Sequence, residues 1–121
     1  MGFLAVVTTA VALAAPVKTV ASYCSPSGDV CYGVFTRGKV VLLRISTAAH
    51  YFPRYTLCVR PPAGAQRCGS FPVFRGVAST WGSSVRHGRQ FPAPGAGVYR
   101  VTWKLGSGPL GPTLRFRLPV R

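Results

Sequence analysis

The stretch that decides the fold is GVYRVTWKLGSGPLGPTLRFRLPVR, residues 97–121. Apolar side chains alternate with polar or basic ones on both sides of the GSGPLG segment, and this period of two is typical of half-buried β-strands joined by a turn. Tyr99, Val101 and Trp103 share one phase of the first strand. The pattern predicts a hairpin with one apolar face and one basic face.

The rest of the chain repeats this pattern in short β-rich runs separated by glycine and proline. Such runs occupy residues 31–37, 39–47, 54–60, 68–75, 83–91, 98–105 and 113–120. Strands of this number and spacing, with no convincing helix, repeat or linker between them, predict a single all-β domain at 22–121, a two-sheet sandwich of about seven strands. The inward phase predicts a core of Val41, Leu43, Ile45, Tyr55, Leu57, Val59, Tyr99, Val101, Trp103, Leu105, Leu114, Phe116 and Leu118.

Residues 1–21 are expected to form a signal peptide with a helical apolar part. The apolar run at 3–15 is shorter than the roughly 20 residues of a membrane span. Small residues follow at 19–21, as they do at signal cleavage sites. We expect cleavage after Ala21, with Ala14 as the alternative, and a secreted mature chain without a membrane span.

The four cysteines fit an exported protein. Cys24, Cys31, Cys58 and Cys68 are even in number and lack the paired C-x-x-C spacing of a zinc site, so disulfides are expected. Three connectivities are possible. Local geometry favours a bridge within CSPSGDVC, residues 24–31, and a second one across the PPAGA turn, where the two cysteines would face each other in a hairpin.

The charge balance is strongly basic. Fifteen Lys and Arg stand against one acid, Asp29, for a net charge of +14, which attracts polyanions. Six cations share the outward phase of three strands, with Arg100 expected opposite Arg117 and Thr102 opposite Arg115. A register shift of two residues would keep the faces. This expected anion-binding face consists of Arg54, Arg60, Arg100, Lys104, Arg115 and Arg117. The alternative is a merely solvated surface whose arginines reflect a coding bias.

The segment FPAPGAGVYRVTW, residues 91–103, resembles the turn and penultimate strand of immunoglobulin-like and fibronectin-III-like domains through its Y-x-V-x-W array. The overall layout is also similar to that of small uncharacterised secreted proteins of high-GC bacteria. The resemblance implies an immunoglobulin-like sandwich in which the Tyr99 hydroxyl bonds to backbone upstream, as in a tyrosine corner. It also implies that the strand at 54–60 lies beside the strand at 98–105, so that the six cations share one sheet face. The cysteines depart from it, since they are not placed as the inter-sheet bridge of antibody domains.

Catalysis, metals and cofactors are not expected. One side-chain acid cannot supply the carboxylate pair of a glycosidase. Ser83 or Ser84, His87 and Asp29 could be nominated for a triad, but no nucleophile-elbow sequence accompanies them. The chain approaches the G-x-Y-x-V-x-W strand of copper-binding envelope sandwiches, yet it offers only the histidines at 50 and 87, and no His- or Met-rich N-terminus.

The expected function is therefore binding of anionic cell-wall polymers or acidic polysaccharides. Nucleic acid is disfavoured because the aromatic residues of these strands point inward instead of offering a stacking platform. Two alternatives remain, a structural or protein-interaction module of unknown partner, and a protease inhibitor that presents the bridged loop RPPAGAQRC, residues 60–68. Trp81 is expected either to pack against the sandwich or to contact a sugar from a loop. The oligomeric state is left open.

Overall fold

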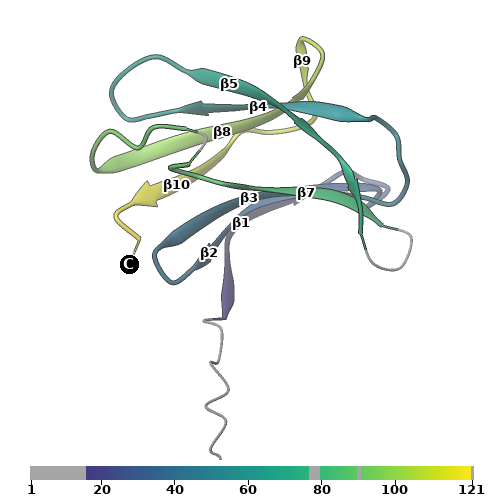
Figure 1. The fold of residues 1–121 in the computed structure, drawn as a ribbon, viewed down its shortest axis with the longest axis horizontal. Helices are drawn as coiled ribbons and strands as arrows, with labels where there is room; N and C mark the ends of the chain where they lie inside the picture. Colours follow the sequence, from purple (N-terminus) through teal and green to yellow (C-terminus); the bar gives the residue numbers. More distant parts are fainter. Residues whose placement is uncertain (1–15, 77–79, 90, 121) are drawn as a thin grey trace, which may run out of the picture.

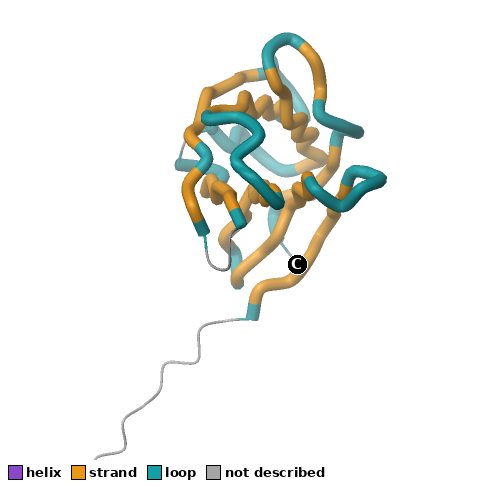
Figure 2. The backbone as a smooth tube through the Cα atoms, turned by 90° about the vertical axis from the view of Figure 1, so that its right-hand side faces the viewer, coloured by secondary structure: helices purple, strands orange, loops and turns teal. Residues whose placement is uncertain are grey.

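The domain is an all-β sandwich of two antiparallel sheets (Figure 1). The computed structural model describes residues 16–76, 80–89 and 91–120, and none of them forms a helix (Figure 2). Sheet A contains, in spatial order, β1 (Val17–Cys24), β2 (Val30–Arg37), β3 (Val40–Thr47), β7 (Trp81–Arg86) and β6 (Phe74–Arg75). Sheet B contains β10 (Leu114–Leu118), β8 (Gly97–Leu105), β4 (Arg54–Arg60) and β5 (Arg67–Pro72), with β9 (Gly108–Pro109) beside β8.

The strand order is immunoglobulin-like. The strands β2-β3-β7-β6 take the A-B-E-D order of that fold, and β10-β8-β4-β5 take the G-F-C-C′ order. The chain changes sheets between β3 and β4, between β5 and β6, and between β7 and β8. The expected neighbourhood of β4 and β8 is confirmed, and β1 is an additional strand at the edge of sheet A.

Two of the predicted runs differ most from the observed strands. The run at 68–75 is divided between the sheets, because Val73 turns inward and its N–H donates to the Pro53 carbonyl, while Phe74 begins β6. The run at 83–91 begins earlier, at Trp81, and ends at Arg86, where a turn containing Gly88 at φ 91° follows.

The first strand overlaps the expected signal peptide. Residues 1–15 of that segment lie outside the described residues, whereas residues 17–21 belong to β1 and pair with β2, from Val17 opposite Arg37 onward. Cleavage after Ala21 would remove the first five of the eight residues of this strand. Cleavage after Ala14 would leave it whole.

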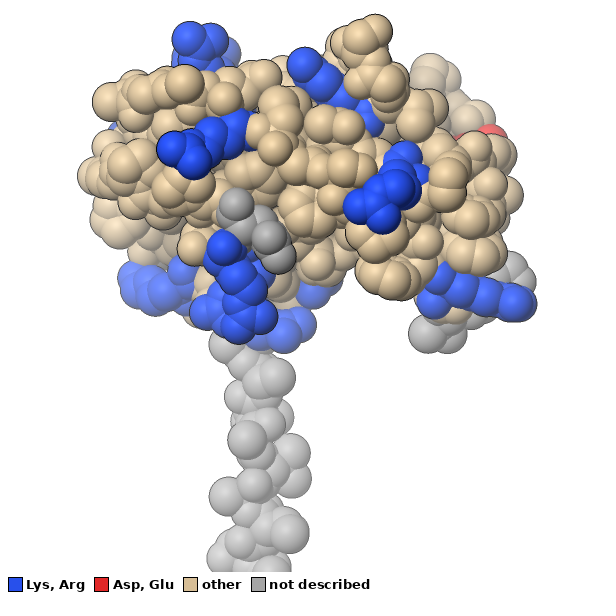
Figure 3. All heavy atoms as spheres, turned by 45° about the horizontal axis from the view of Figure 1, so that its top comes forward, with Lys and Arg blue, Asp and Glu red and all other residues tan. Residues whose placement is uncertain are grey.

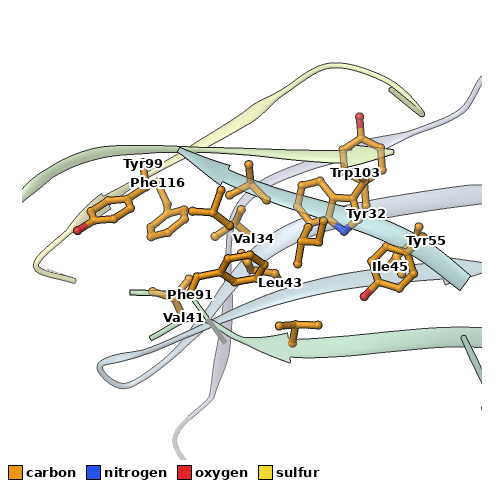
Figure 4. Close-up of a cluster of buried hydrophobic side chains, with 14 of the residues drawn as sticks. Tyr32, Val34, Val41, Leu43, Ile45, Tyr55, Phe91, Tyr99, Trp103 and Phe116 are labelled. Atoms are coloured by element: carbon orange, nitrogen blue, oxygen red, sulfur yellow. The ribbon is translucent and has the colours of Figure 1, made fainter. Parts of the chain in front are cut away.

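The core lies between the sheets and contains ten of the thirteen predicted residues (Figure 4). It also contains six residues that were not predicted, namely Tyr32, Val34, Phe52, Val73, Val85 and Phe91. Trp103, Tyr99 and Leu57 are fully buried, and the Trp103 ring stacks on Tyr32 at 4.4 Å between ring centroids. Leu105 is wrong as a core residue: it is 46% exposed, because β8 continues past the sandwich into a short hairpin with β9. Leu114 and Leu118 are only partly buried.

Both predicted disulfides are present. Cys24–Cys31 joins β1 to β2 and Cys58–Cys68 joins β4 to β5, each between residues directly opposite in the register. Each bridge therefore lies within a single sheet, the first in sheet A and the second in sheet B, and neither joins the two sheets. The Gly28 residue at φ 77° forms part of the turn that brings the first pair together.

The start of β8 is fixed by the expected tyrosine contact. The Tyr99 hydroxyl donates to the Gly95 carbonyl at 2.6 Å, four residues upstream. Tyr99 stacks on Phe116 of β10, with 5.2 Å between ring centroids. The corner therefore anchors the two strands that carry most of the basic face.

Candidate functional site

Three arginines form one row across the outer face of sheet B. Arg100 of β8 lies directly opposite Arg60 of β4 on one side and Arg115 of β10 on the other. The next residues in the register, Val59, Val101 and Leu114, have the opposite phase and face the core. Directly opposed Cβ atoms in a sheet are about 5 Å apart, so the Cβ atoms of the three arginines lie within about 10 Å of one another. We call Arg60, Arg100 and Arg115 the arginine row.

The register of the last hairpin differs from the prediction by two residues. Arg100 faces Arg115, and Arg117 faces Val98, whereas Arg100 opposite Arg117 was expected. The cause is β9, which folds back at once on Lys104 and Leu105 and leaves extra residues before β10 begins. Because the shift is two residues, the faces are unchanged, and Arg115 enters the row in place of Arg117.

The other three predicted cations lie outside the row. Arg117 is two residues further along β10. Lys104 belongs to a row with Thr56, and Arg54 lies beyond that row, where its Nε donates to the Ser70 hydroxyl at 2.9 Å. The disulfide Cys58–Cys68 and Thr102 separate Lys104 and Arg54 from the arginine row. The structure thus brings three of the six side chains into one row and spreads the others over the same sheet.

No carboxylate belongs to sheet B. The only acidic side chain of the chain is Asp29, in the turn between β1 and β2 of sheet A. Burial, together with the charge and hydrogen bond of Asp29, raises the pKa of Tyr51, which places this carboxylate beside a tyrosine. Figure 3 shows the side of the molecule with sheet B, where Lys and Arg side chains form separate groups among uncharged residues. The arginine row is therefore a like-charge array without an acidic partner in its sheet.

The residues considered for a triad have other contacts. The Ser83 hydroxyl is 2.7 Å from the Tyr55 hydroxyl. His87 packs edge-on against Tyr99 and Phe116, its Nε2 is buried without a hydrogen-bond partner, and burial lowers its pKa. The described residues contain no group of three or more side chains suited to hold a metal ion.

The bridged hairpin between β4 and β5 projects with an exposed tip. Pro62 packs against Gly97, where an added Cβ would approach the proline ring to 2.8 Å. Residues 62–68 are exposed. Trp81 is partly buried, and its ring stacks on His50 with 4.0 Å between ring centroids. Of the two expectations for Trp81, packing against the sandwich is therefore the one observed.

A second feature lies on the outer face of sheet A and was missed by the sequence analysis. It is an open trough of about 880 Å³ that crosses the sheet. Its floor consists of the small outward-facing residues Ser22, Gly33, Ser46, Gly82 and Ser84. The sequence carries no signal for it, because these residues belong to separate strands and only the register brings them together.

Two aromatic rings border the trough, and one arginine lies in its middle. Phe35 lies across the backbone of Gly33, where an added Cβ would be 2.9 Å from its ring. The Arg44 guanidinium lies 5.6 Å from the centroid of that ring, and its Nε is 3.4 Å from the Ser84 hydroxyl. Phe74 of β6 lines the trough at the far edge of the sheet from β1 and is 63% exposed.

The comparisons with known proteins gave no assignment. No protein-family model, no curated protein and no solved structure matches the chain. The two disulfides are typical of proteins that fold in an oxidising environment. In the described part of the chain, no helix is long and apolar enough to span a membrane.

Proposed function

We propose that this protein is a secreted module that binds anionic polymers of the cell envelope or extracellular space, and that it is not an enzyme. The observation that carries the proposal is the arginine row, three directly opposed cations in a sheet without a carboxylate. Like charges opposite one another destabilise a sheet by some tenths of a kcal/mol, so the row has a cost in the isolated protein. A polyanion bound across it would remove that cost.

The chemistry of the row suits phosphate or carboxylate groups spaced along a chain. Guanidinium groups form bidentate hydrogen bonds with both anions, and they stay charged at every physiological pH. Arg117 lies about 7 Å further along the sheet and extends the positive surface. Tyr99, Trp103 and Phe116 are buried, so the strands that carry the row offer no aromatic platform for unstacked bases.

The expected export signal and the disulfides support an extracellular location, where cell-wall polymers and acidic polysaccharides are the abundant polyanions. Residues 1–21 have the composition of a signal peptide. Net charge alone would draw the protein to any polyanion, so the proposal is that the row is used in preference to the other cations.

A charge-matched comparison tests this preference. One variant replaces Arg60, Arg100 and Arg115 with Gln. A control replaces three exposed arginines outside sheet B and its outer face, Arg37, Arg86 and Arg89. Both variants lose three positive charges, and co-sedimentation with purified cell wall and binding to immobilised heparin are measured over a salt series.

The row variant is expected to bind both polymers more weakly and with a shallower salt dependence. If each arginine meets one phosphate of a flexible strand, the slope of log affinity against log salt falls by about 2. The control is expected to keep most of the wild-type affinity. Equal losses in both variants would show non-specific attraction, and binding that is insensitive to salt would count against the proposal altogether.

A further inference from the structure

We infer that the trough on sheet A is a second binding site, which takes an acidic oligosaccharide with a carboxylate on a pyranose ring. The trough lies on the opposite sheet from the arginine row, and this inference does not depend on the function proposed for that row. Its evidence is the combination of a small-residue floor, two border phenylalanines and one arginine.

The shape fits a short chain of rings better than a compact ligand. The trough crosses the strands from the Cys24–Cys31 bridge of β1 and β2 to Phe74 of β6. Five strands span about 19 Å at their usual spacing. Gly33 and Gly82 leave no room for a Cβ, which would come within 2.8 Å of the Ala21 carbonyl and 2.7 Å of the Ile45 carbonyl, respectively. Phe35 covers Gly33, so the open part of the floor lies at Gly82, which is partly exposed and carries no side chain that would hold a ring away from the backbone.

The exposed phenylalanine indicates what the ligand presents. A 63% exposed ring beside a concave surface keeps apolar area in water that a ligand would cover. One face of a pyranose ring consists of C–H groups and packs on an aromatic plane, while its hydroxyls point to the sides. The hydroxyls of Ser46 and Ser84 are exposed on the floor and suit those groups.

Arg44 gives the preference for an acidic sugar. It is half-buried between the face of Phe35 and the Ser84 hydroxyl, in the middle of the trough. Neither neighbour carries a negative charge, so a sugar carboxylate would be its first ionic partner, with bidentate geometry available. An extended peptide is a poorer candidate because the trough lies on the face of the sheet, where the strand backbones already pair with one another.

Titration calorimetry at near-physiological salt tests the site with three probes. These are a trisaccharide of galacturonic acid, the matching neutral trisaccharide of galactose, and inorganic tripolyphosphate. The variants are Phe74→Ala and Arg44→Gln, with Arg86→Gln as the control, since Arg86 is an exposed cation on the same outer face. A triple Gln variant of the arginine row separates this site from the one proposed on sheet B. Thermal unfolding confirms that each variant folds.

The wild type is expected to bind the acidic trisaccharide more tightly than the neutral one. Phe74→Ala is expected to weaken both sugars, and Arg44→Gln to remove the preference for the acidic sugar, which is on the order of tenfold for one charged hydrogen-bonded pair. Arg86→Gln and the row variant are expected to keep sugar binding. No binding of either sugar, equal losses in Arg44→Gln and Arg86→Gln, or tripolyphosphate binding that Arg44→Gln alone removes would overturn the inference.

Discussion

Replacing the central cation of the arginine row should make the isolated protein more stable. Arg100 has a like charge directly opposite on each side, so Arg100→Gln removes two repulsions at once. At about 6 Å in water, one pair of unit charges repels by about 0.7 kcal/mol, so two pairs give about 1.4 kcal/mol as an upper value. Because long side chains splay apart, we expect a gain of about 0.5–1 kcal/mol at low salt.

The measurement is urea denaturation of Arg100→Gln and wild type at about 10 mM and at about 1 M salt, where the screening length falls from about 30 Å to about 3 Å. The gain should be present at low salt and absent at high salt. Arg37→Gln is the control, because Arg37 lies opposite Val17 and Val40 and has no like charge across either strand pair. A loss of stability in Arg100→Gln at low salt, or a gain of equal size at high salt, would refute the electrostatic interpretation of the row.

Three further predictions concern the scaffold. Burial lowers the pKa of His87, so the unfolded chain takes up this proton at a higher pH than the folded chain. Stability should therefore fall as the pH drops below about 6.5, by at most about 1.4 kcal/mol per pH unit, and His87→Leu should flatten a plot of unfolding free energy against pH; an unchanged plot would contradict this role of His87. Tyr99→Phe removes the hydroxyl bonded to the Gly95 carbonyl and should cost about 1 kcal/mol in urea denaturation, and an unchanged midpoint would mean that the corner contributes nothing. A chain that begins at Ser22 lacks five of the eight residues of β1 and should be less stable, on the order of 2 kcal/mol, than one that begins at Pro16; equal stability would make cleavage after Ala21 structurally harmless.

The late strands show how far the sequence predicts this structure. The alternation in 97–105 and 114–118 was enough to place Trp103 inside and Arg100 outside, because only one phase of a strand can be buried. The adjacency of β4 and β8 came from the resemblance to the immunoglobulin-like order. The paired cysteines followed from the length and composition of the two turns.

The register and the first strand could not be predicted in this way. The backbone of β9 pairs with β8 through a two-residue turn at Gly106, and no side-chain pattern marks that turn as shorter than the whole GSGPLG segment. The β1 segment has signal-peptide composition, and only its pairing with β2 reveals it as a strand. For the site, sequence predicted a basic face but not its grouping, because the row depends on register across three strands.

The trough on sheet A was missed for a related reason. Its floor residues, such as Gly33, Ser46 and Gly82, come from four strands and are unremarkable in each one. Only the register places them side by side, with Phe74 as a border after the chain has changed sheets at Val73. A surface formed by small residues on separate strands has no signature in a linear pattern.

The most direct test of the arginine row is an NMR titration of the ¹⁵N-labelled protein with inorganic polyphosphate at physiological salt. The proposal predicts that amide shifts concentrate in the segments of β4, β8 and β10 around Arg60, Arg100 and Arg115. Shifts spread evenly over the exposed cations of both sheets, including Arg37, Arg86 and Arg89, would contradict it.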